Sequence, residues 1–354
     1  MKPFNKLFSP LTSSKALSII IIVGFVVFVN SLFNGFVGDD SAQAIANLFT
    51  DPSAFSNFFS GGSFSNGGGQ QIAGIYYKPL LNTHLSLIFS IFGDSPASFH
   101  FFQIMLHILN SSILFLFFSR FFKKELALLL SLVFLIHPIN SEAVFYVSNA
   151  QETLFFLFGI LALYLATIFE SKKQLAIIVL LLLCSLLSKE TGILFVIISV
   201  IYMVFIRKKY VILFIISSLV MFASYLLLRM QATGLLEVPL NAPIAQLSLG
   251  ERLLHIPSIF FFYVYTFLFP FKLAASYQWT NEYISFGGFF LPVIINSVVI
   301  LLISLFAVFL YKRFRNKYLP IYIFFCLWFF LGIGLHLQLF PLDATVAERW
   351  FYFP

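Results

Sequence analysis

Two adjacent carboxylates, Asp39 and Asp40, directly follow a strongly apolar run in the segment FNGFVGDDSAQAIAN. A pair of carboxylates that faces water can supply a general base for a hydroxyl nucleophile, or it can bind a hard cation such as Mg²⁺ or Mn²⁺. A doublet alone is more often the solvated end of a helix. The doublet therefore indicates chemistry only if other polar groups lie on the same side of the molecule.

The composition is that of an integral membrane protein. The 354 residues are 60% hydrophobic and 10% charged, and their mean hydropathy is +0.97, whereas soluble domains carry about 25% charged residues. The net charge of +7 lies in short basic clusters beside apolar runs, which indicates membrane topology and no nucleic-acid partner. Cys184 and Cys326 lie in apolar segments, so neither a disulfide framework nor a cysteine metal site is indicated.

The hydrophobic pattern predicts an all-α polytopic bundle of about nine transmembrane helices with the N-terminus in the cytoplasm. The first apolar run could also be a signal peptide, but its length favours an uncleaved helix. A long first outer loop (34–97) contains an interfacial helix (76–93), and a second outer loop (230–288) contains a re-entrant or interfacial segment near 255–271. The chain ends without a polar tail, so we expect one transmembrane domain (1–354) that lacks its C-terminal helices. The expected spans are 16–33, 98–119, 126–137, 152–169, 174–187, 191–206, 210–228, 289–310 and 318–339.

Two of these helices are too short for the membrane. The apolar runs in 126–137 and 174–187 reach only about 18 to 21 Å, against a hydrocarbon core of about 30 Å. Their outer ends must lie below the membrane surface, where ionisable groups are costly unless they face a polar cavity or one another. We therefore expect an outward-facing aqueous cavity, lined by polar groups at that depth: His137, Glu142, Gln151, Glu152, Lys189 and Glu190.

Basic residues on the same side could hold a phosphate leaving group, and the candidates are Lys78, Lys189, Arg229 and Arg349. A base, a phosphate clamp and an entrance from the lipid together favour transfer from a lipid-phosphate donor. Simpler interpretations stay open for each signal: HPINSEA as a proline turn, SKETG as a hairpin with a local Lys189–Glu190 pair, and Glu348–Arg349 as a salt bridge. His107, inside a helix, is expected to hydrogen-bond a neighbouring helix.

The order of the motifs FVGDD, YYKPL, SFHFFQIMLHILNS, HPINSEAVFYVSNAQE, LLSKETG and VAERWFYFP resembles that of the transmembrane and tetratricopeptide-repeat O-mannosyltransferases and their prokaryotic relatives, in the GT-C superfamily of polytopic glycosyltransferases. The resemblance spans residues 33–354. It implies a polyprenyl-phosphate sugar donor, an active site on the outer face and a catalytic acidic motif in the first outer loop. Asp39 or Asp40 would then be the base, and Arg349 a phosphate contact. The matching donor-site positions are His137, Glu142, Lys189 and Glu190.

Two departures limit the resemblance. Relatives often carry an arginine near the position of Asn149 or Gln151, and because this chain has none there, a phosphate contact at that point cannot be inferred. No tetratricopeptide repeats follow Pro354, so a protein acceptor recruited by such repeats cannot be inferred either. We expect a glycosyltransferase of the prokaryotic plasma membrane that moves a sugar, as mannosyltransferases do, to a protein or glycan hydroxyl on the extracytoplasmic face. The alternative is a polytopic transporter or lipid flippase. Transporters usually carry ionisable groups near the midplane of the membrane, whereas here, apart from His107, these groups lie at the outer ends of the helices or in the inner basic clusters, which favours the enzyme. Asp39 is the preferred base, with Asp40 orienting it or holding a cation.

Overall fold

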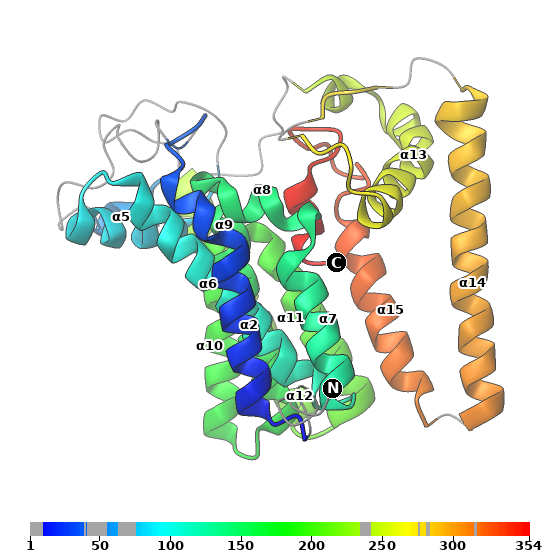
Figure 1. The fold of residues 1–354 in the computed structure, drawn as a ribbon, viewed down its shortest axis with the longest axis horizontal. Helices are drawn as coiled ribbons and strands as arrows, with labels where there is room; N and C mark the ends of the chain where they lie inside the picture. The colour runs from blue at the N-terminus through cyan, green and yellow to red at the C-terminus, as the bar shows by residue number, and fades with distance from the viewer. Residues whose placement is uncertain are drawn as a thin grey trace, which may run out of the picture. The chain divides into compact units, whose positions relative to one another are not determined.

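The computed structural model describes residues 10–38, 40, 55–62, 76–233, 242–274, 277–280, 284–314 and 317–354 (Figure 1). In these ranges the secondary structure is helical, and the isolated antiparallel bridge Tyr277–Val346 is not part of a strand. The chain divides into two compact units, residues 1–203 with 207–235 and residues 204–206 with 236–354. Each unit is described by itself below.

The first unit is a bundle of upright helices, with α5 and α8 at its upper end in Figure 1. The helix α9 packs closely against α6 and α10, so it lies at the centre of the unit. The helices of this unit are α2 (Ser13–Phe28), α4 (Phe55–Ser60), α5 (Pro79–Phe92), α6 (Pro96–Phe118), α7 (Lys124–Ile136), α8 (Ser141–Phe145), α9 (Ala150–Ile168), α10 (Lys172–Ser188), α11 (Ile193–Tyr202) and α12 (Val211–Thr233), with short 3-10 helices η1 (Val29–Phe33), η3 (Pro138–Asn140), η4 (Val147–Asn149) and η5 (Glu190–Gly192).

The second unit contains α13 (Leu249–Leu268), α14 (Leu291–Phe314) and α15 (Leu319–Gly334), with η9 (Glu348–Tyr352) near the end of the chain. The helix α13 begins at Leu249, before the segment expected near 255–271, and it continues through Pro257. The amide of Asn296 on α14 donates to the carbonyl of Pro257 at 2.8 Å, which ties the two helices together.

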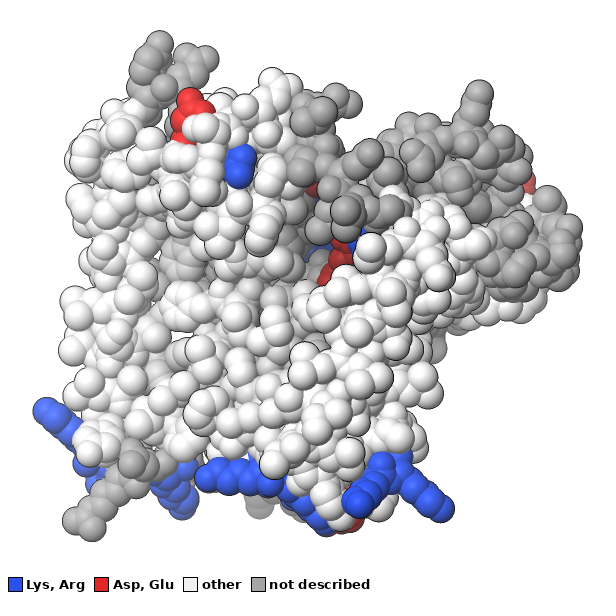
Figure 2. Space-filling model, turned by 180° about the vertical axis from the view of Figure 1, so that it is seen from behind, with Lys and Arg blue, Asp and Glu red and all other residues white. Residues whose placement is uncertain are grey.

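The prediction of an all-α polytopic membrane protein is confirmed. Among the residues that the structure describes, six helices are long and apolar enough to cross a membrane, or up to seven if the bent pair Lys124–Ile136 and Pro138–Phe145 is one span. A helix is present at each of the nine expected positions, but α10 and α15 have only 17 and 16 residues. Lys and Arg side chains gather along the lower edge of the face in Figure 2, below a broad uncharged surface.

Two polar side chains on α6, Gln103 and His107, support the bend between α7 and α9, and we call them the polar stripe. Because α7 ends at Ile136, the carbonyl of Leu135 has no partner in its own helix, and it receives a hydrogen bond from Nε2 of His107 at 2.8 Å. One turn earlier on α6, the amide of Gln103 donates to the carbonyl of Ala143 in α8 at 2.5 Å. The expectation that His107 bonds a neighbouring helix is confirmed, and the stripe fixes the segment that carries HPINSEA.

Candidate functional site

Asp40 is held by three hydrogen bonds at the start of a helix. Its Oδ1 accepts from the backbone N–H of Ser148 at 2.6 Å and from the Ser148 hydroxyl at 2.7 Å, and its Oδ2 accepts from the N–H of Val37 at 3.3 Å. Ser148 lies in η4, which leads into α9, and the N-terminal end of a helix favours a nearby anion. Asp40 is almost fully buried. Its neighbour Asp39 lies outside the described residues.

Two opposing effects set the acidity of Asp40. Burial raises the pKa of its carboxyl above the ordinary 3.8, because a charge is costly away from water, and the hydrogen bonds from Ser148 lower the pKa again. The charge on Asp40 therefore depends on Ser148, which lies 108 positions away in the sequence.

The turn before the doublet requires a glycine. Gly38 has φ +52°, in the left-handed region, and a Cβ atom placed there would lie 2.8 Å from the hydroxyl oxygen of Tyr146. Tyr146 and Ser148 come from the same break between α8 and α9, so one short segment contacts the acidic turn at two points. This contact fixes the backbone on both sides of position 39.

Two ion pairs, one buried and one partly exposed, hold the tip of the α10–α11 hairpin. Lys189 Nζ lies 2.6 Å from Oε1 of Glu152 at the start of α9, and Arg229 of α12 lies 2.6 Å from Oε1 of Glu190. Lys189 and Glu190 thus pair with two other helices and not with each other. The exposed side-chain fractions are 12% for Lys189 and 1% for Glu152, and 7% for Arg229 and 33% for Glu190. The first pair is therefore kept from bulk water, and the second is open to water through Glu190.

Two buried polar atoms beside these pairs have no hydrogen-bond partner within the described ranges of the chain: Oε1 of Gln151 and the hydroxyl of Tyr225. Gln151 precedes Glu152 in α9, and Tyr225 lies one turn before Arg229 in α12. Since buried polar groups are normally paired, these atoms are candidate ligand contacts: the Gln151 oxygen can accept from a ligand hydroxyl, and the Tyr225 hydroxyl can donate to a ligand oxygen.

The other candidates of the first unit have local contacts at the same end. Lys78 is buried before α5, with its Nζ 4.1 Å from the centre of the Tyr76 ring. His137 caps η3, because its Nδ1 accepts from the N–H of Ile139 at 3.2 Å. The carbonyl of Glu142 accepts from the amide of Asn149 at 3.3 Å, which joins this segment to η4.

Arg349 lies in the second unit, where its guanidinium is 5.8 Å from the centre of the Trp350 ring. The adjacent Glu348 is buried and accepts from the hydroxyl of Tyr277 at 2.5 Å and from the N–H of Ala274 at 2.8 Å. Glu348 therefore anchors the segment around residue 274. A role for Arg349 beside the doublet stays a prediction.

The structure thus joins Asp40 to the HPINSEA–SNAQE segment, and joins that segment to the SKE tip through Glu152. The sequence did not indicate Ser148, Tyr146 or Tyr225, and no pattern along the chain distinguishes these residues. Among the residues that the structure describes, no group of three His, Cys, Asp or Glu side chains could hold a metal. Because Asp39 lies outside them, a cation at the doublet stays a prediction.

Changing Gly38 to Ala tests the acidic turn. The Cβ atom of the new alanine clashes with the Tyr146 oxygen. The alanine must also adopt a left-handed backbone conformation, which costs about 1–2 kcal/mol. We expect a lower unfolding midpoint in detergent than for Gly35→Ala, because nothing lies within 4 Å of the Cβ position at Gly35. In the double variant Gly38→Ala/Tyr146→Phe, the loss of stability that comes from the clash should disappear, and the loss that comes from the left-handed backbone should remain. Equal midpoints for Gly38→Ala and Gly35→Ala would contradict this geometry.

Comparison with known proteins places the same region in context. A model of the family described as dolichyl-phosphate-mannose-protein mannosyltransferase matches residues 78–228. The human protein O-mannosyl-transferase TMTC3 is 31% identical over 205 residues, which are 54% of this chain and 22% of that protein. The mouse protein of the same name is 29% identical over 209 residues, which are 55% of this chain and 22% of that protein. The matched region thus spans about a fifth of these relatives. No solved structure is significantly similar to the chain.

The matched residues 78–228 include Glu142, Ser148, both ends of the Glu152–Lys189 pair and Glu190. Over residues 78–228 the chain is therefore similar to the dolichyl-phosphate-mannose-protein mannosyltransferase family, and these matches support the resemblance to the GT-C superfamily of glycosyltransferases.

Proposed function

We propose that this protein transfers a sugar from a polyprenyl-phosphate donor to a hydroxyl group of a protein acceptor, and that the sugar is mannose. The observation that carries the proposal is the group of contacts at one end of the first unit, which comprises the Asp40–Ser148 clamp and the two ion pairs. The partners Ser148, Glu152, Lys189 and Glu190 lie within the region that matches mannosyltransferases, whereas Asp40 and Arg229 lie outside it.

The extracytoplasmic face is the side on which we propose that transfer occurs. The ends of the helices away from the site carry basic clusters, such as Lys123–Lys124 and Arg207–Lys209, and basic clusters favour the cytoplasmic side. The helices that lead from these clusters to the site, such as α7 and α12, would cross the membrane between the two ends.

Asp39 is the proposed base and Asp40 its positioning residue. Both oxygens of Asp40 already accept hydrogen bonds from the protein, so Asp40 is poorly placed to take a proton from a substrate. Asp39 would take the proton of the acceptor hydroxyl while the oxygen of that hydroxyl forms a bond to the anomeric carbon of the sugar. The bond from that carbon to the phosphate oxygen breaks, and polyprenyl phosphate leaves with the electron pair.

Lys189 and Arg229 would stabilise the charge on the departing phosphate. Each is paired with one carboxylate, so the cationic groups are oriented and charge-balanced before a ligand arrives. A phosphate oxygen can share these donors, and the unpaired oxygen of Gln151 can accept from a sugar hydroxyl.

Separate Asn variants of the doublet test the two roles. Asp39→Asn should lower sugar transfer from a polyprenyl-phosphate donor about 10²-fold or more, the usual effect of removing a general base. Asp40→Asn keeps an oxygen for Ser148 and should cost about tenfold, which corresponds to weakening one charge-assisted hydrogen bond by about 1.4 kcal/mol. Undiminished transfer in both variants would exclude the proposed base, and equal loss would exclude the division of roles.

The pH profile of transfer tests the Asp40–Ser148 bond. Protonation of Asp40 weakens the clamp, so activity should fall as the pH drops through a pKa that burial holds above 3.8. In Ser148→Ala the hydroxyl bond that lowers this pKa is lost while the backbone bond from position 148 remains, and the acidic limb of the profile should move to higher pH. The same substitution in an Asp40→Asn background should move nothing. A shift to lower pH in Ser148→Ala would contradict the assignment.

The ion pair at Lys189 needs a test that separates stability from binding. Lys189→Gln alone leaves Glu152 buried and unpaired, which should destabilise the protein by about 3–5 kcal/mol. The double variant Glu152→Gln/Lys189→Gln removes both charges and should recover most of the unfolding midpoint, yet keep a raised KM for the donor. If the KM returns to normal together with the stability, Lys189 has a structural role only.

A further inference from the structure

The turn between α11 and α12, which we call the basic turn (Arg207–Tyr210), has an unusual backbone. It follows the π-helical segment Met203–Arg207, and Lys208 and Tyr210 have φ values of 59° and 56°. The left-handed region favours glycine, so a lysine at position 208 is kept against a conformational cost. Residues in such conformations persist where the surrounding structure holds them, and they are concentrated at sites with a function.

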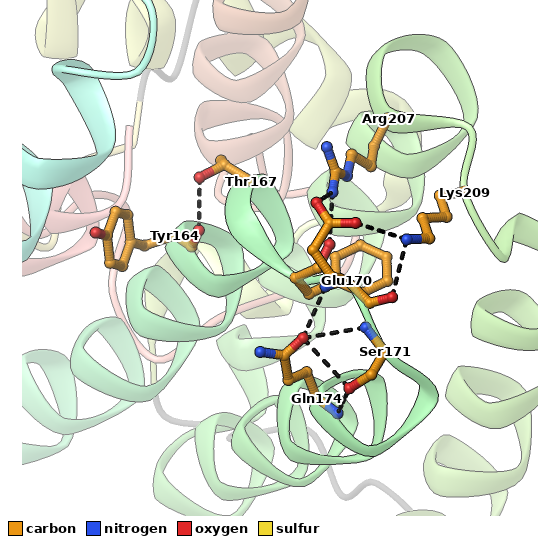
Figure 3. A network of polar contacts seen from close by, with 8 residues as sticks. Tyr164, Thr167, Glu170, Ser171, Gln174, Arg207 and Lys209 are labelled. Atoms are coloured by element: carbon orange, nitrogen blue, oxygen red, sulfur yellow. Dashed lines mark hydrogen bonds and ion pairs between the residues drawn. The ribbon is translucent and has the colours of Figure 1, made fainter.

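The basic turn binds a carboxylate of its own chain (Figure 3). Arg207 donates to Oε1 of Glu170 at 2.7 Å, and Lys209 Nζ donates to Oε2 at 2.6 Å and to the Glu170 carbonyl at 2.8 Å. These contacts, that of Lys209 first, lower the pKa of Glu170, and the Glu170 side chain is 69% exposed. The turn therefore holds an anion with two oxygens at a position that water and other ligands can reach.

The basic charge at this end exceeds what the nearby acids neutralise. In the described segments 10–15, 119–126, 169–173 and 207–210 the acids are Glu125 and Glu170, and the basic residues are Lys15, Arg120, Lys123, Lys124, Lys172, Lys173, Arg207, Lys208 and Lys209. Lys172, Lys173 and Lys208 form no ion pair within the part of the chain that is described. A second anion would be attracted here.

The location identifies the kind of anion. Arg207 ends one candidate membrane span and Val211 begins the next, so the basic turn lies at the level of lipid headgroups. The ring of Tyr210 and the side chain of Ile212 are exposed beside it, by 36% and 75%, and continue as an apolar surface along α12. We propose that the basic turn binds the headgroup phosphate of an anionic phospholipid, whose acyl chains lie along α12, and that Glu170 competes with this phosphate for Arg207 and Lys209.

The test compares the unfolding midpoint of the full chain, and its affinity for phosphatidylglycerol, in phosphatidylcholine nanodiscs with and without that lipid. Lys208→Gln leaves the Glu170 contacts intact and should lower the phosphatidylglycerol affinity about fivefold, the usual effect of one lysine at a membrane surface. Glu170→Gln should raise the affinity, because it removes the competing charge. Soluble glycerol phosphate should not reproduce the effect.

The matched control is Lys123→Gln, which changes an exposed lysine that directly precedes α7 and makes no side-chain hydrogen bond to cap that helix. It should lower the affinity by less than about twofold, because Lys123 is not part of the basic turn and salt screens exposed charges that do not contact the bound phosphate. Equal losses in Lys123→Gln and Lys208→Gln would show general attraction to the membrane surface and overturn the site. An unchanged or lower affinity in Glu170→Gln, or stabilisation by soluble glycerol phosphate, would also overturn it.

Discussion

The cost of polar groups below the membrane surface determines the architecture of the first unit. A lipid environment offers no hydrogen bonds, so each carbonyl and charge at that depth must find a partner in the protein. The bend after α7 frees the carbonyl of Leu135, and His107 of α6 satisfies it. The charges at the hairpin tip are satisfied in the same way by Glu152 and Arg229. Short helices and buried polar contacts are therefore parts of one arrangement.

That arrangement also positions the candidate site. The stripe on α6 holds the break between α7 and α9, and the break supplies Tyr146 and Ser148 to the acidic turn. The same break begins α9, where Glu152 binds Lys189. A change in the stripe should therefore reach the doublet through η4, without any direct contact between α6 residues and a substrate.

Much of the fold follows from the sequence because hydrophobic period and basic clusters are local signals. The positions of the helices from α5 to α12 agree with the expected spans to within a few residues at most boundaries. The exception in the second unit is α13, which begins at Leu249 although the segment is expected near 255–271. Pro257 lies inside this helix, where Asn296 of the neighbouring α14 bonds its carbonyl.

The site was predictable in type but not in pairing. Ionisable residues at the ends of short helices identified Glu152, Lys189 and Glu190, but the local Lys189–Glu190 pair is absent because each side chain reaches a different helix. Ser148 could not be found, because a serine in a polar segment has no pattern of its own and its partner Asp40 lies 108 positions away. Such long-range contacts depend on tertiary structure, which spacing along the chain does not encode.

The most direct test of the central claim, that the upper end of the first unit binds a lipid-phosphate sugar donor, is photocrosslinking of a polyprenyl-phosphate-mannose analogue with its reactive group on the sugar. Mass spectrometry of the labelled protein should place the label in residues 137–152 or 188–192, and unlabelled donor should compete with it. Label confined to the basic ends of the helices, or label that unlabelled donor does not reduce, would contradict the account.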